Sequence, residues 1–230
     1  MKVFAISDIH LDGNKDKSMA IFGVEWLNHK QRLIANWNSR VCKEDIVLIP
    51  GDISWAMKWE EVLKDLDLLH HLPGKKIYVR GNHDYWWQKI NRLNTLYEDM
   101  FFIQNKAYMC HRLAICGTRG WICPEKDGFT MQDNKIYQRE LVRLKLSLDD
   151  AMSKQAKKII VMLHYPPTNE GAFSSAFIDL IMQYPVSHVI YGHLHDKHGW
   201  GKNIKGKVGN IIYSLVSADY LEFMPIEIDA

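Results

Sequence analysis

The segment IVLIPGD, residues 46–52, places a run of aliphatic residues directly before a glycine and an aspartate. A short apolar run bounded by a turn signal is typical of a buried β-strand. Four other aliphatic runs end in polar residues in the same way. The five predicted strands cover residues 3–7, 46–50, 76–80, 159–163 and 188–191.

A cluster of polar residues follows each of these predicted strands. In chain order the clusters are Asp8-Ile9-His10, Gly51-Asp52, Gly81-Asn82-His83-Asp84, His164-Tyr165-Pro166-Pro167 and Gly192-His193-Leu194-His195. In an open α/β sheet, ligands bind in the crevice outside the carboxyl ends of the strands, so clusters distant in sequence can meet there. We therefore expect all five clusters to form one site.

The spacing of apolar residues predicts helices over residues 29–40, 59–69, 85–97 and 132–154. Short strands at 107–110 and 113–117 follow one another without a helix, which marks a second sheet. We expect residues 207–215 and 221–228 to form a closing antiparallel pair. No linker divides the sequence, so we expect one α/β domain over residues 1–230, with two packed sheets flanked by helices.

Composition limits the classes of function. A net charge of +2, a pI of about 8.2 and the lack of a basic block do not indicate nucleic-acid binding, although they leave it possible. The first apolar stretch is too short for a signal peptide, and no run is long enough to span a membrane. The four cysteines show no C-x-x-C pairing. These features predict a soluble, cytoplasmic protein without a membrane partner, and they leave the oligomeric state open.

The spacing within the clusters suits metal binding. Asp8 and His10 are two residues apart, so in an extended chain both side chains point to the same side and can reach one metal. His193 and His195 repeat this spacing and can serve neighbouring ions. A carboxylate at Asp52 can bridge two cations. Each cluster alone also fits an ordinary turn at a strand end, and only their combination favours a metal site.

The tetrapeptide at residues 81–84 offers a different chemical group at each of three positions. Asn82 supplies a neutral oxygen ligand. His83 can stay unligated as a proton donor, and Asp84 can orient its imidazole and raise its basicity. An N-cap made by Asn82 or Asp84 is a structural alternative. We expect His83 and Asp84 to be catalytic, with Asn82 and His83 also contacting the substrate.

The five clusters, in this order, resemble those of the calcineurin-like metallophosphoesterase superfamily, and the resemblance spans residues 8–195. It implies a four-layer α/β/β/α sandwich of two mixed sheets flanked by helices. It also implies two metal ions that share Asp52. One ion would be held by Asp8, His10, Asp52 and His195, and the other by Asp52, Asn82, His164 and His193.

The implied reaction is hydrolysis of a small phosphomonoester or phosphodiester by a hydroxide that the two metals activate, with His83 protonating the leaving oxygen. Mixed nitrogen and oxygen ligands suit Mn, Fe, Zn, Co or Ni, and we favour Mn or Fe. A nuclease of the same superfamily and a non-catalytic scaffold are the alternatives. Intact ligands and an intact His83 disfavour the scaffold, and the lack of a basic track disfavours the nuclease.

The chain departs from some branches of that superfamily. Protein Ser/Thr phosphatases continue the bridging aspartate as Gly-Asp-x-x-Asp-Arg-Gly, whereas this chain reads GDISWAM at residues 51–57 and lacks their phosphate-clamping arginine. Trp55 stands where purple acid phosphatases place an iron-ligating tyrosine. Arg119, in a turn after a predicted strand, is a candidate replacement clamp, because a guanidinium suits phosphate oxygens. A solvated turn arginine is the alternative.

Overall fold

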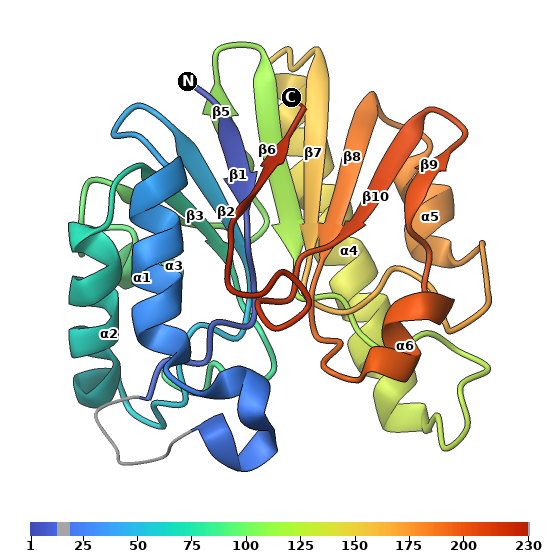
Figure 1. Cartoon of the computed structure of the whole chain (residues 1–230). Helices are drawn as coiled ribbons and strands as arrows, with labels where there is room; N and C mark the ends of the chain where they lie inside the picture. Colours follow the sequence, from blue (N-terminus) through green and yellow to red (C-terminus); the bar gives the residue numbers. More distant parts are fainter. Residues whose placement is uncertain (13–18, 230) are drawn as a thin grey trace.

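Two β-sheets pack face to face, and helices cover both outer faces (Figure 1). The computed structural model describes residues 1–12 and 19–229. Within this described part, one sheet has five strands in the order β11-β1-β2-β3-β4, and the other has six in the order β5-β6-β7-β8-β10-β9. Both sheets contain parallel and antiparallel pairs. The expected four-layer α/β/β/α sandwich of two mixed sheets is confirmed.

The first sheet is parallel except at its β11 edge. Helices α1, α2 and α3 cover its outer face (Figure 1), and α1 turns the buried side chains of Leu33 and Trp37 towards the core. The elements of this half are β1 (Val3–Ala5), η1 (Met19–Phe22), η2 (Val24–Trp26), α1 (His29–Arg40), β2 (Ile46–Pro50), α2 (Trp59–His71), β3 (Lys75–Val79), α3 (Ile90–Leu93), β4 (Met100–Phe102) and β11 (Ile226–Ile228).

The second sheet has four central parallel strands and an antiparallel strand at each edge. Its long helix α4 begins with a capping box, in which Thr130 and Asp133 satisfy each other's backbone N–H groups. The elements of this half are β5 (Tyr108–Cys110), β6 (Leu113–Thr118), α4 (Met131–Ser153), β7 (Lys158–Leu163), α5 (Ala176–Ile181), β8 (Val186–Tyr191), α6 (Lys197–Lys202), β9 (Gly206–Val208) and β10 (Ile211–Leu215).

Apolar side chains fill the space between the two sheets. Leu48 and Val79 of the first sheet and Ile160 and Met162 of the second belong to this buried cluster, while two further clusters lie beneath the helices. The central strands are therefore covered on both faces. This explains why the segment that became β2 is an unbroken aliphatic run instead of an alternating one.

Two predictions of secondary structure were wrong. Of residues 85–97, only Ile90–Leu93 are helical. Trp86 lies in a turn at residues 85–86, is fully buried and donates its indole N–H to Asp84. These contacts hold the start of the segment in a non-helical conformation. The predicted pairing of 207–215 with 221–228 is also incorrect. Residues 207–215 span a hairpin, β9–β10, and β11 instead pairs antiparallel with β1 in the other sheet.

No helix in the described part of the chain is long and apolar enough to cross a membrane. The four cysteines Cys42, Cys110, Cys116 and Cys123 are free thiols, as their spacing in the sequence suggested.

Candidate metal centre

The polar residues that follow β1, β2, β3, β7 and β8 converge between the two sheets. Nε2 of His10, beyond β1, lies 3.3 Å from Nε2 of His195, beyond β8. Oδ1 of Asn82, beyond β3, lies 2.6 Å from Nε2 of His164, beyond β7. Because these strands run parallel within their sheets, their carboxyl ends meet at one edge. The structure thus brings residues from the separate sequence clusters together in one region.

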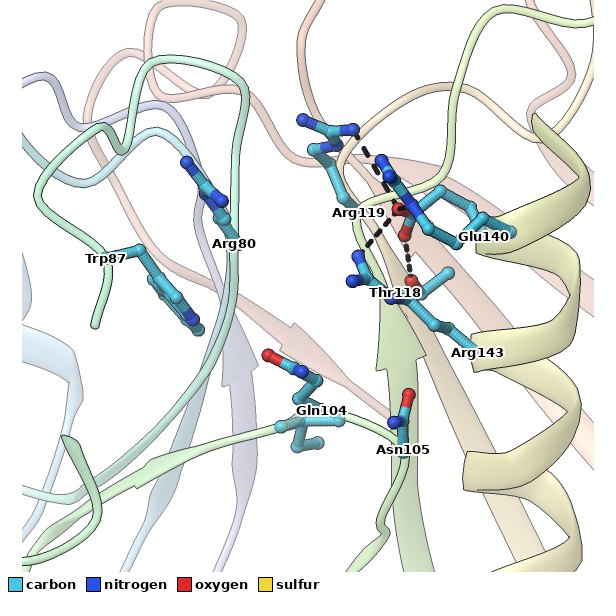
Figure 2. A pocket seen from close by; sticks show the side chains of 10 residues that line it. Arg80, Trp87, Gln104, Asn105, Thr118, Arg119, Glu140 and Arg143 are labelled. Atoms are coloured by element: carbon cyan, nitrogen blue, oxygen red, sulfur yellow. Dashed lines mark hydrogen bonds and ion pairs between the residues drawn. The ribbon is translucent and has the colours of Figure 1, made fainter. Parts of the chain in front are cut away.

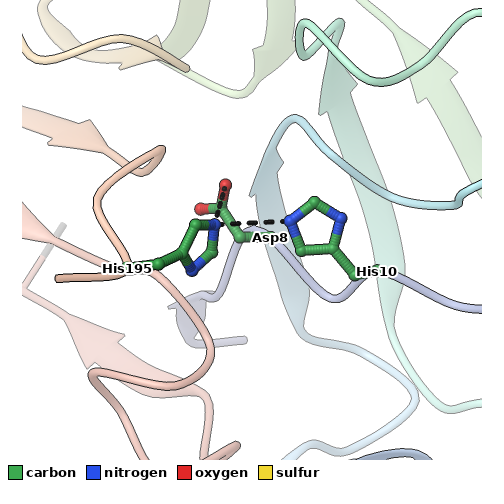
Figure 3. Close-up of side chains that lie close together, drawn as sticks. All are labelled: Asp8, His10 and His195. Atoms are coloured by element: carbon green, nitrogen blue, oxygen red, sulfur yellow. Dashed lines mark hydrogen bonds and ion pairs between the residues drawn. The ribbon is translucent and has the colours of Figure 1, made fainter. Parts of the chain in front are cut away.

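One group of possible metal ligands consists of Asp8, His10 and His195 (Figure 3). Oδ1 of Asp8 lies 3.6 Å from Nε2 of His195. Asp8 and His10 are buried, whereas the His195 side chain is 35% exposed. Two imidazole nitrogens that face each other beside a carboxylate are a donor set that a divalent cation of the Mn-to-Zn series fits.

A second group consists of Asp8, Asp52 and His164. Nε2 of His164 lies 3.5 Å from Oδ2 of Asp52, and Asn82 adds an amide oxygen to it. The ring centroid of His193 lies 5.0 Å from that of His164. All seven residues expected to bind metal therefore lie within this one region.

Asp52 belongs to the second group and also approaches His10 of the first group. Its Oδ2 atom is 3.8 Å from Nε2 of His10 and 3.5 Å from Nε2 of His164. Its Oδ1 atom accepts the backbone N–H of His83 at 2.8 Å. Asp8 also belongs to both groups, but the His164 atom that it approaches is Nδ1, at 3.8 Å. This nitrogen already lies 3.0 Å from the carbonyl oxygen of Pro50. Of these two aspartates, Asp52 approaches in each group an Nε2 atom, which no backbone carbonyl of the described residues engages.

Four of the expected ligands have left-handed backbone conformations. The φ angles are 54° at Asp8, 45° at His10, 52° at Asp52 and 71° at His193. Such values are uncommon for residues other than glycine and cost of order 1–3 kcal/mol each. The expectation that Asp8 and His10 leave β1 in an extended conformation is therefore wrong. Their side chains converge because tight turns, not strand alternation, aim them at the site.

Gly51 permits the close approach of the turns that carry the ligands. Its φ angle is 92°, and a Cβ atom there would lie 2.7 Å from Cα of Gly81 and 2.7 Å from Nδ1 of His164. A side chain at this position would separate Asp52 from both neighbours. The glycine in the sequence GD is thus required by the geometry of the site.

Two of the histidines have partners that set the orientation of their rings. Nδ1 of His195 lies 3.1 Å from Oδ2 of Asp219, and Nδ1 of His164 lies 3.0 Å from the carbonyl oxygen of Pro50. With the proton on Nδ1, each Nε2 presents its lone pair to the site. Asp219 was missed in the sequence, although it follows the apolar β10 segment as the other clusters follow their strands.

The electrostatics of the site also fit a cation. Burial lowers the pKa of His164 to about 4 and that of His193 to about 3, which keeps both rings in the neutral form that binds metal. Burial and the nearby carboxylates of Asp84 and Asp8 raise the pKa of Asp52 well above its ordinary value. A positive ion would relieve this repulsion between buried carboxylates.

His195 is paired with two carboxylates, those of Asp219 and Asp8. Burial alone would lower the pKa of His195, but its hydrogen bonds with Asp219 and Asp8 raise it to about 10. Burial alone would raise the pKa of Asp8, and the imidazoles of His195, His164 and His10 outweigh that effect and lower it. In the metal-free protein, a proton on His195 thus supplies part of the positive charge that the carboxylates require.

The prediction that Asp84 orients the His83 ring is wrong. The buried Asp84 carboxylate accepts backbone N–H groups from Gly81 at 2.7 Å, Asp52 at 3.0 Å and Ile53 at 2.9 Å, as well as the Trp86 indole N–H. The bonds from Asp52 and Ile53 tie the turn after β3 to the turn after β2, and the bonds from Gly81 and Trp86 lie within the segment after β3. Asp84 therefore holds the backbone that carries Asp52 and Asn82.

His83 lies beside the ligand groups without belonging to either of them. The centroid of its ring is 4.5 Å from the ring centroid of Trp55 and 5.8 Å from that of His10. Burial and the neighbouring His195 lower the pKa of His83. Trp55, the residue that distinguishes this chain from purple acid phosphatases, thus packs against His83 and stacks on His10 at 4.9 Å.

The Arg119 side chain packs beside Glu140 and Trp121. Its Nη2 atom is 3.8 Å from Oε1 of Glu140, and its guanidinium lies 4.4 Å from the Trp121 ring centroid. It lines a pocket near α4 whose described lining residues include no expected metal ligand. A different pocket, of about 660 Å³, contains His193 and His195 together with Tyr165 and Lys126. That pocket is the space that adjoins the metal centre.

The fold and this site define a class of metal-dependent phosphoesterases. The family model for calcineurin-like phosphoesterases matches residues 1–197, and the chain belongs to this family.

The individual proteins that resemble this chain match it over part of its length or at low sequence identity. The uncharacterized protein MJ1445 of Methanocaldococcus jannaschii is 34% identical over 91 residues, which are 38% of this chain and 49% of that protein. The chain thus matches about half the length of this curated relative. Phosphopantetheinyl hydrolase (PptH) from Mycobacterium tuberculosis has a similar fold, with a TM-score of 0.59, 14% identity, and coverage of 99% of this chain and 95% of that chain. The protein of unknown function AQ665 from Aquifex aeolicus gives a TM-score of 0.49 at 16% identity, with coverage of 98% and 95%.

Proposed function

We propose that the protein is a metal-dependent hydrolase that cleaves the phosphate ester, monoester or diester, of a small molecule at a dinuclear centre. One observation supports this most directly: a single oxygen of Asp52 faces an available imidazole nitrogen in each of the two ligand groups. That is the position that a ligand shared by two ions would occupy. The family to which the chain belongs agrees with this reaction class.

Asp8, His10 and His195 would hold one ion, and Asn82, His164 and His193 the other, with Asp52 shared between them. When bound, the two ions would lower the pKa of a water molecule and neutralise charge on the phosphoryl oxygens. The protein holds the rings in place through Asp219 and the Pro50 carbonyl. Mn or Fe is our choice of metal, since the mixed nitrogen and oxygen donors suit either.

His83 is our candidate for the general acid. Its ring lies next to the ligand groups but outside them, and its backbone N–H is fixed to the Asp52 carboxylate. Trp55 packs against the ring and limits its rotation. A proton from this ring would go to the ester oxygen as the bond to phosphorus breaks. With Asp84 committed to backbone amides, Trp55 takes over the positioning of His83.

The ester would occupy the pocket of about 660 Å³ that includes His193 and His195. Its walls come from loops after β6, β7 and β8 and include Tyr165, Lys126 and Asn169. This volume suits a small-molecule ester. The free thiols are consistent with action in the cytoplasm.

A metal-supplemented activity screen tests the proposal. The purified protein would be analysed for metal content and assayed with p-nitrophenyl phosphate, bis-p-nitrophenyl phosphate, cyclic nucleotides and single-stranded DNA. We expect two ions per chain and hydrolysis of at least one small ester, both lost on chelation and restored by Mn²⁺ or Fe²⁺. Asp8→Asn should abolish activity, and Asp229→Asn, at an exposed position, should not. Hydrolysis that survives complete metal removal would refute the proposal.

A further inference from the structure

A second pocket, of about 190 Å³, lies between the end of β3 and helix α4 (Figure 2). Arg80 and Trp87 come from the segment after β3, and residues 103–105 come from the loop between β4 and β5. The other lining side chains come from the end of β6, from the turn that follows it and from α4. Its volume exceeds by several times what one water molecule needs. The proposed ester hydrolysis uses none of the residues that line this pocket.

The walls of this pocket carry an excess of positive charge. Four arginines line it, Arg80, Arg119, Arg139 and Arg143, with Glu140 as the single acidic residue among the described lining residues. The fully buried Glu140 carboxylate lies 2.8 Å from Nη1 of Arg143, 3.5 Å from Nε of Arg139 and 3.8 Å from Nη2 of Arg119. One carboxylate cannot neutralise four guanidinium groups, so three positive charges are uncompensated within the pocket.

Several donors in the pocket have no partner within the described part of the chain. Nε of Arg119 is buried without a hydrogen bond. Arg80 donates from Nε to the carbonyl of Asp84 at 3.2 Å, and its two terminal amino groups make no hydrogen bond or ion pair with the described residues. Guanidinium groups of this kind bind phosphate and carboxylate oxygens through paired hydrogen bonds. The unpaired donors are therefore available to an anion.

Arg80 and Arg119 lie near each other because β3 and β6 approach closely where the two sheets pack. Gly117 of β6 lies so close to β3 that a Cβ atom on it would be 2.8 Å from Cγ1 of Val79. Arg80 follows Val79 directly, and Arg119 lies two residues after Gly117. The same segments also serve the metal centre, because Asn82 lies two residues beyond Arg80 and the carbonyl of Arg119 accepts the N–H of His164 at 3.0 Å.

We propose that this arginine pocket is a binding site for a phosphate group, separate from the metal centre. Trp87 forms one wall, and Arg119 is held in place by Glu140 and by Trp121. The phosphate belongs either to a free anion or to a second phosphate on the substrate. The site rests on the arginines alone and stands whether or not the metal centre hydrolyses esters.

Titration of the metal-loaded protein with inorganic phosphate by calorimetry tests the site. We expect two classes of binding, one at the metals and one in the pocket. Arg143→Gln and Arg80→Gln should each weaken the second class at least tenfold and leave the first in place. Arg112→Gln is the matched control, because it removes one exposed arginine at the opposite end of β6. Circular dichroism checks that each variant is folded.

Crystals soaked in tungstate locate the anion directly by its anomalous signal. A peak in contact with Arg80 and Arg119 supports the site. Phosphate binding that is identical in wild type, Arg80→Gln and Arg143→Gln, with no tungstate in the pocket, would show that the arginines form only a structural ion network and would overturn the proposal.

Kinetics distinguish the two sources of the phosphate. If the pocket takes a second phosphate of the substrate, Arg143→Gln should raise KM for a bisphosphate such as adenosine 3′,5′-bisphosphate, with KM for p-nitrophenyl phosphate unchanged. If it takes a free anion, both KM values should stay unchanged while the second class of phosphate binding is lost. Failure of the ester hydrolysis itself would appear separately, as an inactive protein that still binds phosphate in the pocket.

Discussion

The carboxylate of Asp219 lies 3.1 Å from Nδ1 of His195 and so determines which nitrogen of that ring faces the metal centre. Replacing such a partner of a ligating histidine typically lowers metal affinity 10- to 100-fold. Asp219→Asn should therefore weaken one ion by about that factor, as measured by competition with a chelator. Asp229→Asn controls for the loss of charge. Equal weakening of both ions would show that Asp219 acts on the whole site instead of on His195.

The position of Asp52 between the two groups predicts that its loss affects both ions. Asp52→Asn should reduce metal content at both positions, because a neutral amide binds cations more weakly than a carboxylate. His195→Ala should mainly reduce one position, since His195 contacts only the first group. Elemental analysis together with anomalous scattering measures both. Unchanged metal content in Asp52→Asn would exclude it as a shared ligand.

His83→Ala should keep its metals, because the ring belongs to neither ligand group. A positioned general acid contributes roughly 10²–10⁴-fold to the rate when the leaving group is poor. The variant should therefore lose activity on alkyl phosphates far more than on p-nitrophenyl esters, whose leaving oxygen needs little protonation. Comparison of kcat/KM across leaving groups checks this. An equal loss on both classes would mean that His83 stabilises charge instead of donating a proton.

Gly51→Ala should destabilise the fold as well as the site. The new Cβ atom would lie 2.7 Å from Gly81 and His164, at a φ angle of 92°, so close contact adds to backbone strain and the cost is roughly 2–4 kcal/mol. Gly128→Ala separates the two effects: its φ is 78°, but the added atom meets nothing within 4 Å, and its cost should be about 1 kcal/mol. Urea denaturation measures both. Equal costs would show that the contacts around Gly51 relax freely.

The buried ammonium of Lys76 depends on Asp99. Lys76 is fully buried in β3 and donates to Asp99 at 2.6 Å and to the carbonyl of Leu72, beyond the end of α2. Asp99→Asn should lower the free energy of unfolding by about 2 kcal/mol, less than for a fully buried pair because Asp99 is partly exposed. The double variant Lys76→Met/Asp99→Asn should recover part of this loss. If it does not, the carboxylate acts independently of the lysine.

The strands that build the site were predictable because they are buried on both faces. Residues 46–50 match β2, the 159–163 prediction falls within β7 (Lys158–Leu163), and the helix at 29–40 matches α1. The pairing of the C-terminal strands β9, β10 and β11 was not predictable, since it depends on which edge of each sheet is free. The local signal for the hairpin is Gly209-Asn210, the two-residue turn between β9 and β10.

Residue type and order identified side chains that the structure brings together as possible metal ligands, but they did not predict the backbone geometry of these residues. The left-handed conformations of Asp8 and His10 depend on contacts with the turn after β2, where their N–H groups bond the carbonyls of Gly51 and Asp52. The role of Asp84 likewise depends on which backbone amides fold against it. Local sequence carries no information on such partners, because they come from other strands.

The division of the ligands between two sheets has a consequence for folding. Neither sheet alone holds a complete ligand set: His10 and Asp52 follow strands of the first sheet, and His164 and His195 follow strands of the second. A chain in which only one half has formed would bind metal poorly. Ion binding therefore favours the docked state of the two halves over every partly folded one, and occupancy of the centre reports that folding is complete.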